Sequence, residues 1–251
     1  MAISNAGKKR KRKKMPNCIK PDNSYIKILQ NSFLFDNLGN ELTEKLLKDF
    51  IPVFFKKGEN INPNLTEKYV YIIVEGRLKI TNIDPKTGRS IALFILHTGD
   101  IHDIFTLLDG KEHIVFPIAL DDTIALRTTL KNARDIIKSY PKFNEKFLPY
   151  LGKRLRELEN FSESIVFENT ATRLSKLILK HIANTQNEND HYPLKLINNL
   201  SHESLSELIG SVRSVVSTKM EKLKKEGIII SKRGYLAVKD IEKLIEKCDP
   251  F

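Results

Sequence analysis

Cysteine is scarce and tryptophan is absent in this chain of 251 residues. The two cysteines, Cys18 and Cys248, stand near opposite ends of the chain, and neither a Cys-x-x-Cys pair nor a Cys/His spacing typical of a metal site occurs. An iron–sulfur cluster needs about four cysteine ligands. The cysteine count therefore excludes such a cluster, and it predicts a reducing compartment and no metal site.

Long apolar runs and catalytic motifs are also missing. No apolar run reaches the roughly 18 residues needed to cross a bilayer, and the basic N-terminus is not followed by the apolar part of a secretory signal. A nucleophile elbow, a phosphate-binding loop and paired catalytic carboxylates do not occur either. We therefore expect no membrane partner, no catalytic residues and no enzyme activity.

Residue usage bears on the compartment. Lysine, asparagine and isoleucine are abundant, as in proteins encoded by AT-rich genomes, and the Arg-rich and Ser-rich pattern of an organelle transit peptide is missing. A protein encoded inside a plastid needs no transit peptide. The expected location is the bacterial cytoplasm or the stroma of a chloroplast or other plastid that encodes the protein itself.

Positive charge is in excess and unevenly distributed. The net charge is +11, and the run KKRKRKK, Lys8 to Lys14, carries seven positive charges and no acidic residue. An excess of this kind favours a polyanionic partner, either nucleic acid or an acidic membrane surface. Because the surrounding segment is polar and interrupted by Pro16 and Pro21, residues 1–22 are predicted to be a disordered basic tail.

Strand and helix patterns follow one another along the chain. From about Phe50 to Leu126, short apolar runs alternate with turns, including the turn DPKTGR at Asp84 to Arg89, which predicts an antiparallel β-roll or sandwich. From Asn132 to Asn184 the period becomes helical. Apolar steps of three and four, with one polar position, form an a/d seam of Leu148, Leu151, Leu155, Leu158, Ser162 and Ile165.

The seam has two interpretations. It can pack on its own domain, or it can pair with the same helix of a second subunit, which its length favours. Pro149 lies inside the seam, so a kink or restart of the helix is expected near Lys146 to Leu148.

The stretch LSHESLSELIGSVRSVVSTKMEKL, residues 200–223, has the pattern of two short amphipathic helices joined at a glycine. Ser201 is a predicted N-cap, and Gly210 supplies a tight turn. The inward face of the second helix, starting near Ser211, is predicted to be Val212, Val216, Met220 and Leu223. A strand pattern GIIIS, the turn KRG, a strand pattern YLAV and a last helix capped by Asp240 follow. This order predicts a winged helix-turn-helix.

The predicted fold class is therefore α+β, with an N-terminal antiparallel β-roll, a long dimerisation helix and a C-terminal winged helix-turn-helix. The predicted domains are the basic tail at 1–22, the roll with flanking helices at 23–130, the dimerisation helix and hinge at 131–183, and the DNA-binding domain at 184–251.

Polar residues on the outer face of the second helix are candidate DNA contacts, since the first turns of this helix enter the major groove in helix-turn-helix proteins. Arginine can donate two hydrogen bonds to guanine, whereas hydroxyls and lysines reach bases or phosphates. The predicted contacts are Arg213, Ser214, Ser217, Thr218, Lys224, Lys232 and Arg233. The alternative is an ordinary helical hairpin with a solvated polar face.

The order of roll, long helix and winged helix-turn-helix resembles the cyclic-AMP receptor protein superfamily (Crp/Fnr) of bacterial transcription regulators over residues 50 to 245. Within it, residues 200–223 are similar to the nitrogen-control regulators (NtcA) of cyanobacteria and algal plastids, with LSH, the IG turn, SxR and the following valine in register. The resemblance implies a homodimer that binds a palindromic double-stranded DNA site, works with RNA polymerase and reads guanine of a GTA half-site with Arg213.

The same resemblance implies an effector pocket. Arg154 and Glu159, in GKRLRELE, fall where the nitrogen-control regulators bind 2-oxoglutarate, and a guanidinium suits a carboxylate. A surface ion pair explains the spacing of these two residues equally well. The roll would contribute His102, Asp103, Ile104 and Phe105.

The predicted pocket departs from the superfamily pattern. The Gly-Glu and Arg-Ser of a cyclic-nucleotide cassette are missing from HDIFTLLDGKEHIVF, so cyclic AMP is not expected. Asp103 stands where the resemblance places a glycine, and its charge would repel a dianion. The pocket is therefore expected to be degenerate, with binding weakened, altered or lost. Haem on His97, His102 and His113 is a further alternative, although single histidines in a roll are usually structural.

Two other functions fit the sequence. One is a ligand-sensing module whose winged domain contacts proteins, and the other is a general nucleic-acid binder driven by the basic tail. Salt-dependent, sequence-selective DNA binding would argue against both.

Overall fold

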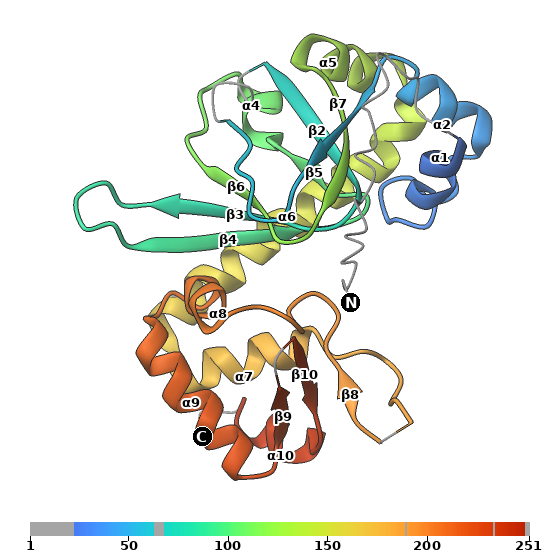
Figure 1. Cartoon of the computed structure of the whole chain (residues 1–251). Coiled ribbons are helices and arrows are strands. Elements are labelled where there is room, and N and C mark those ends of the chain that lie inside the picture. The colour runs from blue at the N-terminus through green and yellow to red at the C-terminus, as the bar shows by residue number, and fades with distance from the viewer. Residues whose placement is uncertain (1–22, 63–67, 189, 233, 249–251) are drawn as a thin grey trace, which may run out of the picture.

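The computed structural model describes residues 23–62, 68–188, 190–232 and 234–248 (Figure 1). The predicted basic tail and Arg233 lie outside these residues. An N-terminal unit and a C-terminal unit are joined by one long helix, α6 (Pro141–Phe167). Two antiparallel sheets form the N-terminal unit. This arrangement confirms the predicted α+β class.

The N-terminal unit is a β-roll. One sheet has the order β1-β7-β2-β5 and the other the order β4-β3-β6, and all of the pairs are antiparallel. Its strands are β1 (Ile51–Phe55), β2 (Tyr69–Glu75), β3 (Leu78–Ile83), β4 (Ser90–Leu96), β5 (Ile101–His102), β6 (Phe116–Ala119) and β7 (Thr123–Thr129). Side chains from the two sheets meet in one core that contains Tyr71, Ile73, Leu78 and Leu96.

The predicted hairpin at Asp84 to Arg89 joins β3 to β4. The Asp84 carboxylate accepts hydrogen bonds from Lys86 N at 3.0 Å and from Thr87 Oγ1 at 2.6 Å. Gly88 has a φ of 68°, in the left-handed region where glycine carries no steric penalty. These contacts set the turn that the sequence predicts, and the hairpin projects from the roll (Figure 1).

Among the described residues, five helices surround or extend the roll, namely α1 (Asn23–Leu29), α2 (Asn40–Leu47), α4 (Ile104–Asp109), α5 (Leu130–Ser139) and α6. A second core joins them to the outer face of the four-stranded sheet and includes Phe143, Phe147 and Tyr150 of α6. The helix is continuous over 27 residues, so the predicted restart before Pro149 does not occur. Burial of Phe147 and Tyr150 on either side of the proline helps to offset the hydrogen bond that proline cannot make.

The C-terminal unit has its own core. Its elements are α7 (Thr170–Lys180), β8 (Tyr192–Pro193), α8 (His202–Leu208), α9 (Arg213–Lys225), β9 (Ile229–Lys232), β10 (Tyr235–Val238) and α10 (Ile241–Glu246). The strands pair in the order β8-β10-β9. Leu174 and Ile178 of α7 are fully buried in this core, so α7, which the sequence-based division placed with the hinge, packs with the C-terminal elements.

Local contacts confirm most of the predicted helix-turn-helix. Ser201 Oγ caps α8 by accepting from Ser204 N at 3.1 Å, and Gly210 turns the chain with a φ of 59°. The prediction for Val212 is wrong, because this residue precedes α9 in an extended conformation and is 43% exposed. It therefore lies off the helical wheel that buries Val216 and its neighbours.

The turn at Gly210 lies against the last part of α6. A Cβ atom added at Gly210 would lie 2.5 Å from Ile165 Cδ1, closer than non-bonded carbon atoms approach. The helix-turn-helix therefore contacts α6 directly through this glycine.

Among the described residues, no helix is long and apolar enough to span a bilayer.

Candidate nucleic-acid interface and effector cavity

In the first turns of α9, some of the predicted DNA contacts are exposed, with no side-chain partner among the described residues, and others already form hydrogen bonds within the chain. Arg213 and Ser214 are exposed at the start of the helix. Ser217 is half-buried, with its hydroxyl 2.7 Å from Nδ1 of His202, and Thr218 Oγ1 donates to the Ser214 carbonyl at 3.1 Å. Arg213 and Ser214 are therefore the side chains most available to a base edge, whereas two of the hydroxyls already have partners.

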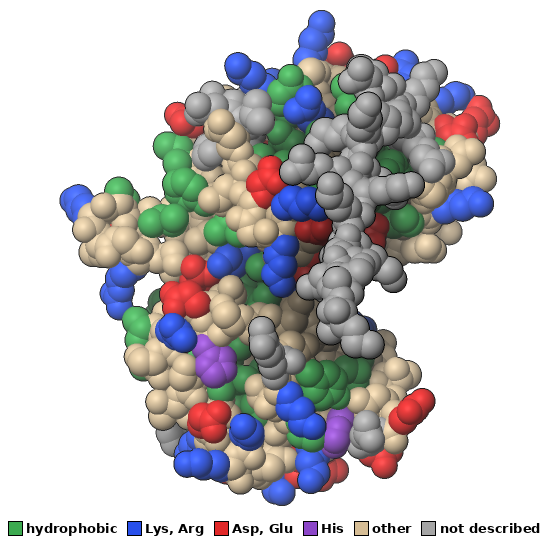
Figure 2. Space-filling view, viewed as in Figure 1, with side chains coloured by type: hydrophobic (Ala, Val, Ile, Leu, Met, Phe, Trp, Pro, Cys, Tyr) green, Lys and Arg blue, Asp and Glu red, His purple; other side chains and the backbone are tan. Residues whose placement is uncertain are grey.

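Lysines continue along the same unit. Lys224, near the end of α9, and Lys232, at the end of β9, are both exposed. Lys224 Nζ lies 4.0 Å from a Glu221 carboxylate oxygen, a weak surface pair that a phosphate can replace. Figure 2 shows Lys and Arg side chains gathered at the lower end of this unit. This distribution suits a backbone of phosphates, which is recognised mainly by charge.

A cavity of about 130 Å³ lies between the roll and α6. Five of the six predicted effector residues line it: His102, Asp103, Ile104 and Phe105 from the roll and Arg154 from α6. The sixth, Glu159, is exposed and is not part of the lining. The structure therefore brings the two predicted parts of the pocket together and leaves Glu159 outside.

Asp103 has an unusual backbone. Its φ of 69° and ψ of 46° are left-handed, a conformation that glycine adopts freely and few other residues adopt. The resemblance places a glycine at this position, and the backbone gives the reason. The side chain is 4% exposed; Oδ1 accepts from Thr106 Oγ1 at 2.8 Å and lies 3.4 Å from His113 Nδ1.

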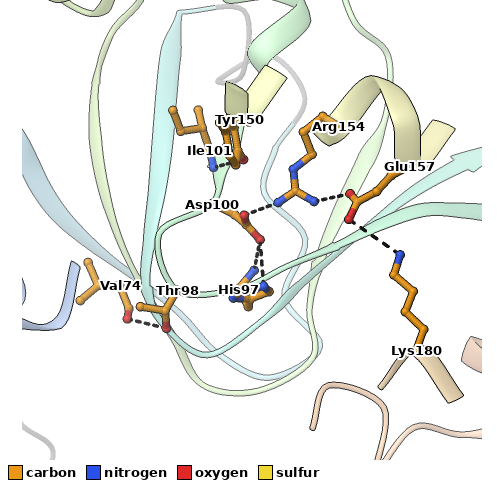
Figure 3. A network of polar contacts seen from close by, with 9 residues as sticks. All are labelled: Val74, His97, Thr98, Asp100, Ile101, Tyr150, Arg154, Glu157 and Lys180. Atoms are coloured by element: carbon orange, nitrogen blue, oxygen red, sulfur yellow. Dashed lines mark hydrogen bonds and ion pairs between the residues drawn. The ribbon is translucent and has the colours of Figure 1, made fainter. Parts of the chain in front are cut away.

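Arg154 belongs to a polar network that leads out of the cavity (Figure 3). The guanidinium forms an ion pair with Asp100 of the roll, and its Nη1 donates to Glu157 Oε2 at 2.7 Å. The other oxygen of Glu157 lies 3.8 Å from Lys180 Nζ at the end of α7. These three successive ion pairs, among Asp100, Arg154, Glu157 and Lys180, are called the relay. The relay connects the cavity wall to the C-terminal unit.

Two buried polar clusters fasten the roll to the C-terminal unit. Glu207 of α8 forms an ion pair with Lys79 of β3 and accepts from Ser90 Oγ at 2.6 Å; these three residues are called the latch. The side chains of Lys79 and Glu207 are 7% and 10% exposed. In the second cluster, Arg77 binds Asp121 with two hydrogen bonds, of 2.6 and 2.9 Å, and donates to Asn199 Oδ1 at 2.7 Å.

Several known proteins are similar in sequence to this chain. Residues 172–247 match the Crp-like helix-turn-helix domain. The chain is 23% identical over 221 residues to the CRP-like cAMP-activated global transcriptional regulator of Mycobacterium tuberculosis, covering 88% of this chain and 98% of that protein. It is 22% identical over 206 residues to the global nitrogen regulator of Synechocystis, covering 79% and 86%. The chain therefore contains a Crp-like helix-turn-helix domain and resembles the Crp/Fnr regulators over most of its length.

The fold of this chain agrees with that resemblance. A solved structure of a CooA mutant from Carboxydothermus hydrogenoformans superposes with a TM-score of 0.71 at 24% identity, and the match covers 87% of this chain and 97% of that one. At this level of identity the similarity establishes the fold. The similarity does not establish the contacts at the cavity and at α9, which are taken from the structure of this chain alone.

Several residues around the cavity and between the two units are not predicted by the sequence patterns. Arg154 pairs with Glu157, three residues along the helix, and not with Glu159. That spacing was visible in GKRLRELE, because residues three apart lie on the same face of a helix. The latch and the bond to Asp100 join segments that are far apart in the chain, and the sequence contains no local signal for them.

We expect Glu207→Gln to loosen the contact between the two units of the protein. Glutamine keeps the shape but removes the charge opposite buried Lys79, at a cost on the order of 2 kcal/mol. Hydrogen exchange at α8 should then accelerate roughly 30-fold. Glu203→Gln, one turn earlier on the same helix and exposed, is the matched control. Equal exchange in the two variants would show that the latch does not hold the units together.

Acid should destabilise the roll through His102. Burial lowers the pKa of this histidine to about 4, and nearby His113 adds to the effect while Asp103 opposes it. In the unfolded chain the pKa is close to the ordinary value of about 6.5. Between these two values the unfolded state binds more protons, so the stability that is present above about pH 6.5 decreases as the pH falls toward 4.

The decrease due to His102 amounts to about 3 kcal/mol, because one pKa unit corresponds to about 1.4 kcal/mol. We expect His102→Gln to flatten the pH dependence of urea unfolding by this amount. His181, whose pKa burial also lowers to about 4, acts with the same sign, so the double variant should flatten it further. An unchanged pH dependence in His102→Gln would refute the prediction.

Proposed function

We propose that this protein is a homodimeric, sequence-specific DNA-binding transcription regulator. The observation that carries the proposal is the exposure of Arg213 and Ser214 at the start of a helix whose other face, Val216, Met220 and Leu223, is buried in a Crp-like helix-turn-helix domain. A helix held in this way presents its first turns to the major groove. The names of the bacterial relatives, which are global regulators, agree with this role.

The apolar face of α6 supports the homodimer. Leu148 and Leu155 are 64% and 63% exposed, and Val166 and Phe167 near the end of the helix are 73% and 78% exposed. Exposed leucines at the a/d spacing of one long helix are a surface that a second copy of the same helix can cover. A two-fold axis between two such helices would place two copies of α9 for a palindromic site.

The cavity supports a regulator that responds to a small effector. The relay joins its Arg154 to Lys180 of α7, so an effector bound in the cavity would lie against a residue that is linked to the DNA-binding unit. Binding of 2-oxoglutarate, as the resemblance to nitrogen regulators implies, requires Arg154 to leave Asp100 and Glu157. The pocket is degenerate in this sense. RNA polymerase is the proposed partner at the promoter, in a bacterial cytoplasm or a plastid stroma.

Selection of bound sequences from a random pool of DNA duplexes, with and without 2-oxoglutarate, tests the proposal. The expected result is a palindrome with GTA half-sites about one helical turn apart. Enrichment of a single half-site would argue against the dimer, and the absence of any enriched sequence would argue for a general nucleic-acid binder. A change in enrichment on adding 2-oxoglutarate would identify the effector.

Removal of residues 1–16 should weaken binding to every duplex without changing the preferred sequence. The run Lys8 to Lys14 carries seven positive charges, and phosphate contacts contain no base information. The slope of log affinity against log salt should decrease by about 0.9 for each phosphate that the tail no longer neutralises. Titrations of one palindrome and one scrambled duplex over a series of salt concentrations measure this effect. If the truncation changed which sequence is preferred, the tail would be reading bases.

A further inference from the structure

The chemistry of the cavity between the roll and α6 defines a class of ligand. We propose that it binds a small uncharged molecule made of one apolar ring and one hydroxyl or N–H donor, for which phenol is the simplest probe. This inference rests on the proposed regulatory function and names the effector class of the same site. Size, lining and the polar groups at one wall each support it.

The size of the cavity limits the ligand to about one ring. Its volume is about 130 Å³. An apolar protein cavity of about 150 Å³ is known to bind benzene. A molecule with two rings, or a nucleotide, would extend beyond this volume.

The lining of the cavity is mainly apolar. Aromatic and aliphatic side chains come from β4, β5, α4 and α6, among them Phe94, Leu96, Ile101 and Leu108. Burial of an apolar ring against such walls is favourable by about 25 cal/mol for each Å² removed from water. Leu108 is 53% exposed, so the cavity opens at the surface beside this residue.

One wall carries buried polar atoms that the chain does not satisfy. His102 and Asp103 are 2% and 4% exposed, and no described residue forms a hydrogen bond with His102 Nε2 or Asp103 Oδ2. A buried polar atom without a partner costs about 1–3 kcal/mol. Because a carboxylate only accepts hydrogen bonds, a ligand that satisfies Asp103 has to donate. One hydroxyl or N–H on the ring meets this requirement.

The charges around the cavity disfavour an anion. Arg154, the cation in the lining, is already held by Asp100 and Glu157. An anion would have to break these ion pairs and also lie near the Asp103 carboxylate, which would repel it. An uncharged ligand leaves the relay intact and avoids both costs.

Calorimetric titration of the full chain with phenol, toluene, benzoate and 2-oxoglutarate tests the proposal. Phenol should bind with one saturable site, toluene about tenfold more weakly because it cannot donate to Asp103, and the two anions not measurably. Asp103→Gly suits the left-handed backbone and removes the acceptor. This variant should bind phenol about tenfold more weakly than the wild type and bind toluene with unchanged affinity. Leu108→Trp, at a half-exposed position in the lining, should block both rings.

Three results would overturn the proposal: no saturable binding of phenol, phenol binding that neither variant changes, and tighter binding of 2-oxoglutarate than of phenol. Binding of every variant to a selected DNA palindrome is measured in the same preparations. Intact DNA binding without phenol binding would refute the ligand class and leave the proposed function standing. Phenol binding without any DNA binding would refute the proposed function and leave the ligand class standing.

Discussion

Leu155→Asp should convert the protein to a monomer and remove its tight binding to a palindrome. In the proposed dimer, each copy loses about 1.5–3 kcal/mol from burial of a leucine and places a carboxylate in an apolar seam. Since both copies change, association should weaken by on the order of 5 kcal/mol, roughly a thousandfold or more. Sedimentation at micromolar protein concentration measures this directly.

A charge elsewhere on α6 is the control for this variant. Asn160→Asp adds the same charge at an exposed position of α6 that is not part of the a/d seam, and should remain a dimer. DNA titrations of Leu155→Asp should show only weak binding, since one half-site contributes about half of the contacts. A wild-type monomer at micromolar concentration, with the helix intact, would contradict both the dimer and the predicted role of the seam.

Arg213→Ala should lower affinity for the palindrome by about 1–3 kcal/mol per half-site, and therefore by about 2–6 kcal/mol for the dimer. The loss should be confined to the guanine, because a bidentate arginine discriminates one base pair. Sites that already lack this guanine should bind the variant and the wild type equally. Titration at one fixed salt concentration against the palindrome and its single-base variants provides the measurement.

Lys224→Ala is the matched comparison, since it removes an exposed positive charge from the other end of α9. This variant should bind all DNA sequences more weakly by the same factor. The slope of log affinity against log salt concentration should decrease by about 0.9 for each phosphate that is no longer neutralised. If Arg213→Ala also weakened every duplex equally, Arg213 would be a phosphate contact, and the assignment of α9 as the reading helix would fail.

The parts of the site that the sequence predicted depend on local rules. The helix-turn-helix follows from the cap at Ser201, the turn at Gly210 and the spacing of Val216 and Met220, all within one short stretch. The prediction that Val212 faces inward is wrong, because a helical wheel assumes a helical backbone and this residue is extended. Local pattern therefore gives the existence of an element more reliably than its first residue.

The contacts between units could not be predicted in this way. Glu207 meets Lys79 across 128 positions of sequence, and Arg154 meets Asp100 across 54. The first pair depends on how α8 packs on β3, and the second on how α6 packs on the turn between β4 and β5. Many other acids and bases in the sequence could pair equally well. The resemblance to a known family placed Arg154 and Asp103 at one pocket, but it did not indicate that Arg154 is already paired inside the chain.

The close approach of Gly210 to Ile165 has a consequence for the spacing of the DNA site. The reading helix rests, through this turn, on the same helix that carries the proposed dimer seam. The separation of two reading helices would then depend on how two copies of α6 cross, and not on the DNA-binding unit. A chimaera that received only residues 172–247 would keep the half-site preference of this protein and take the half-site spacing of its host.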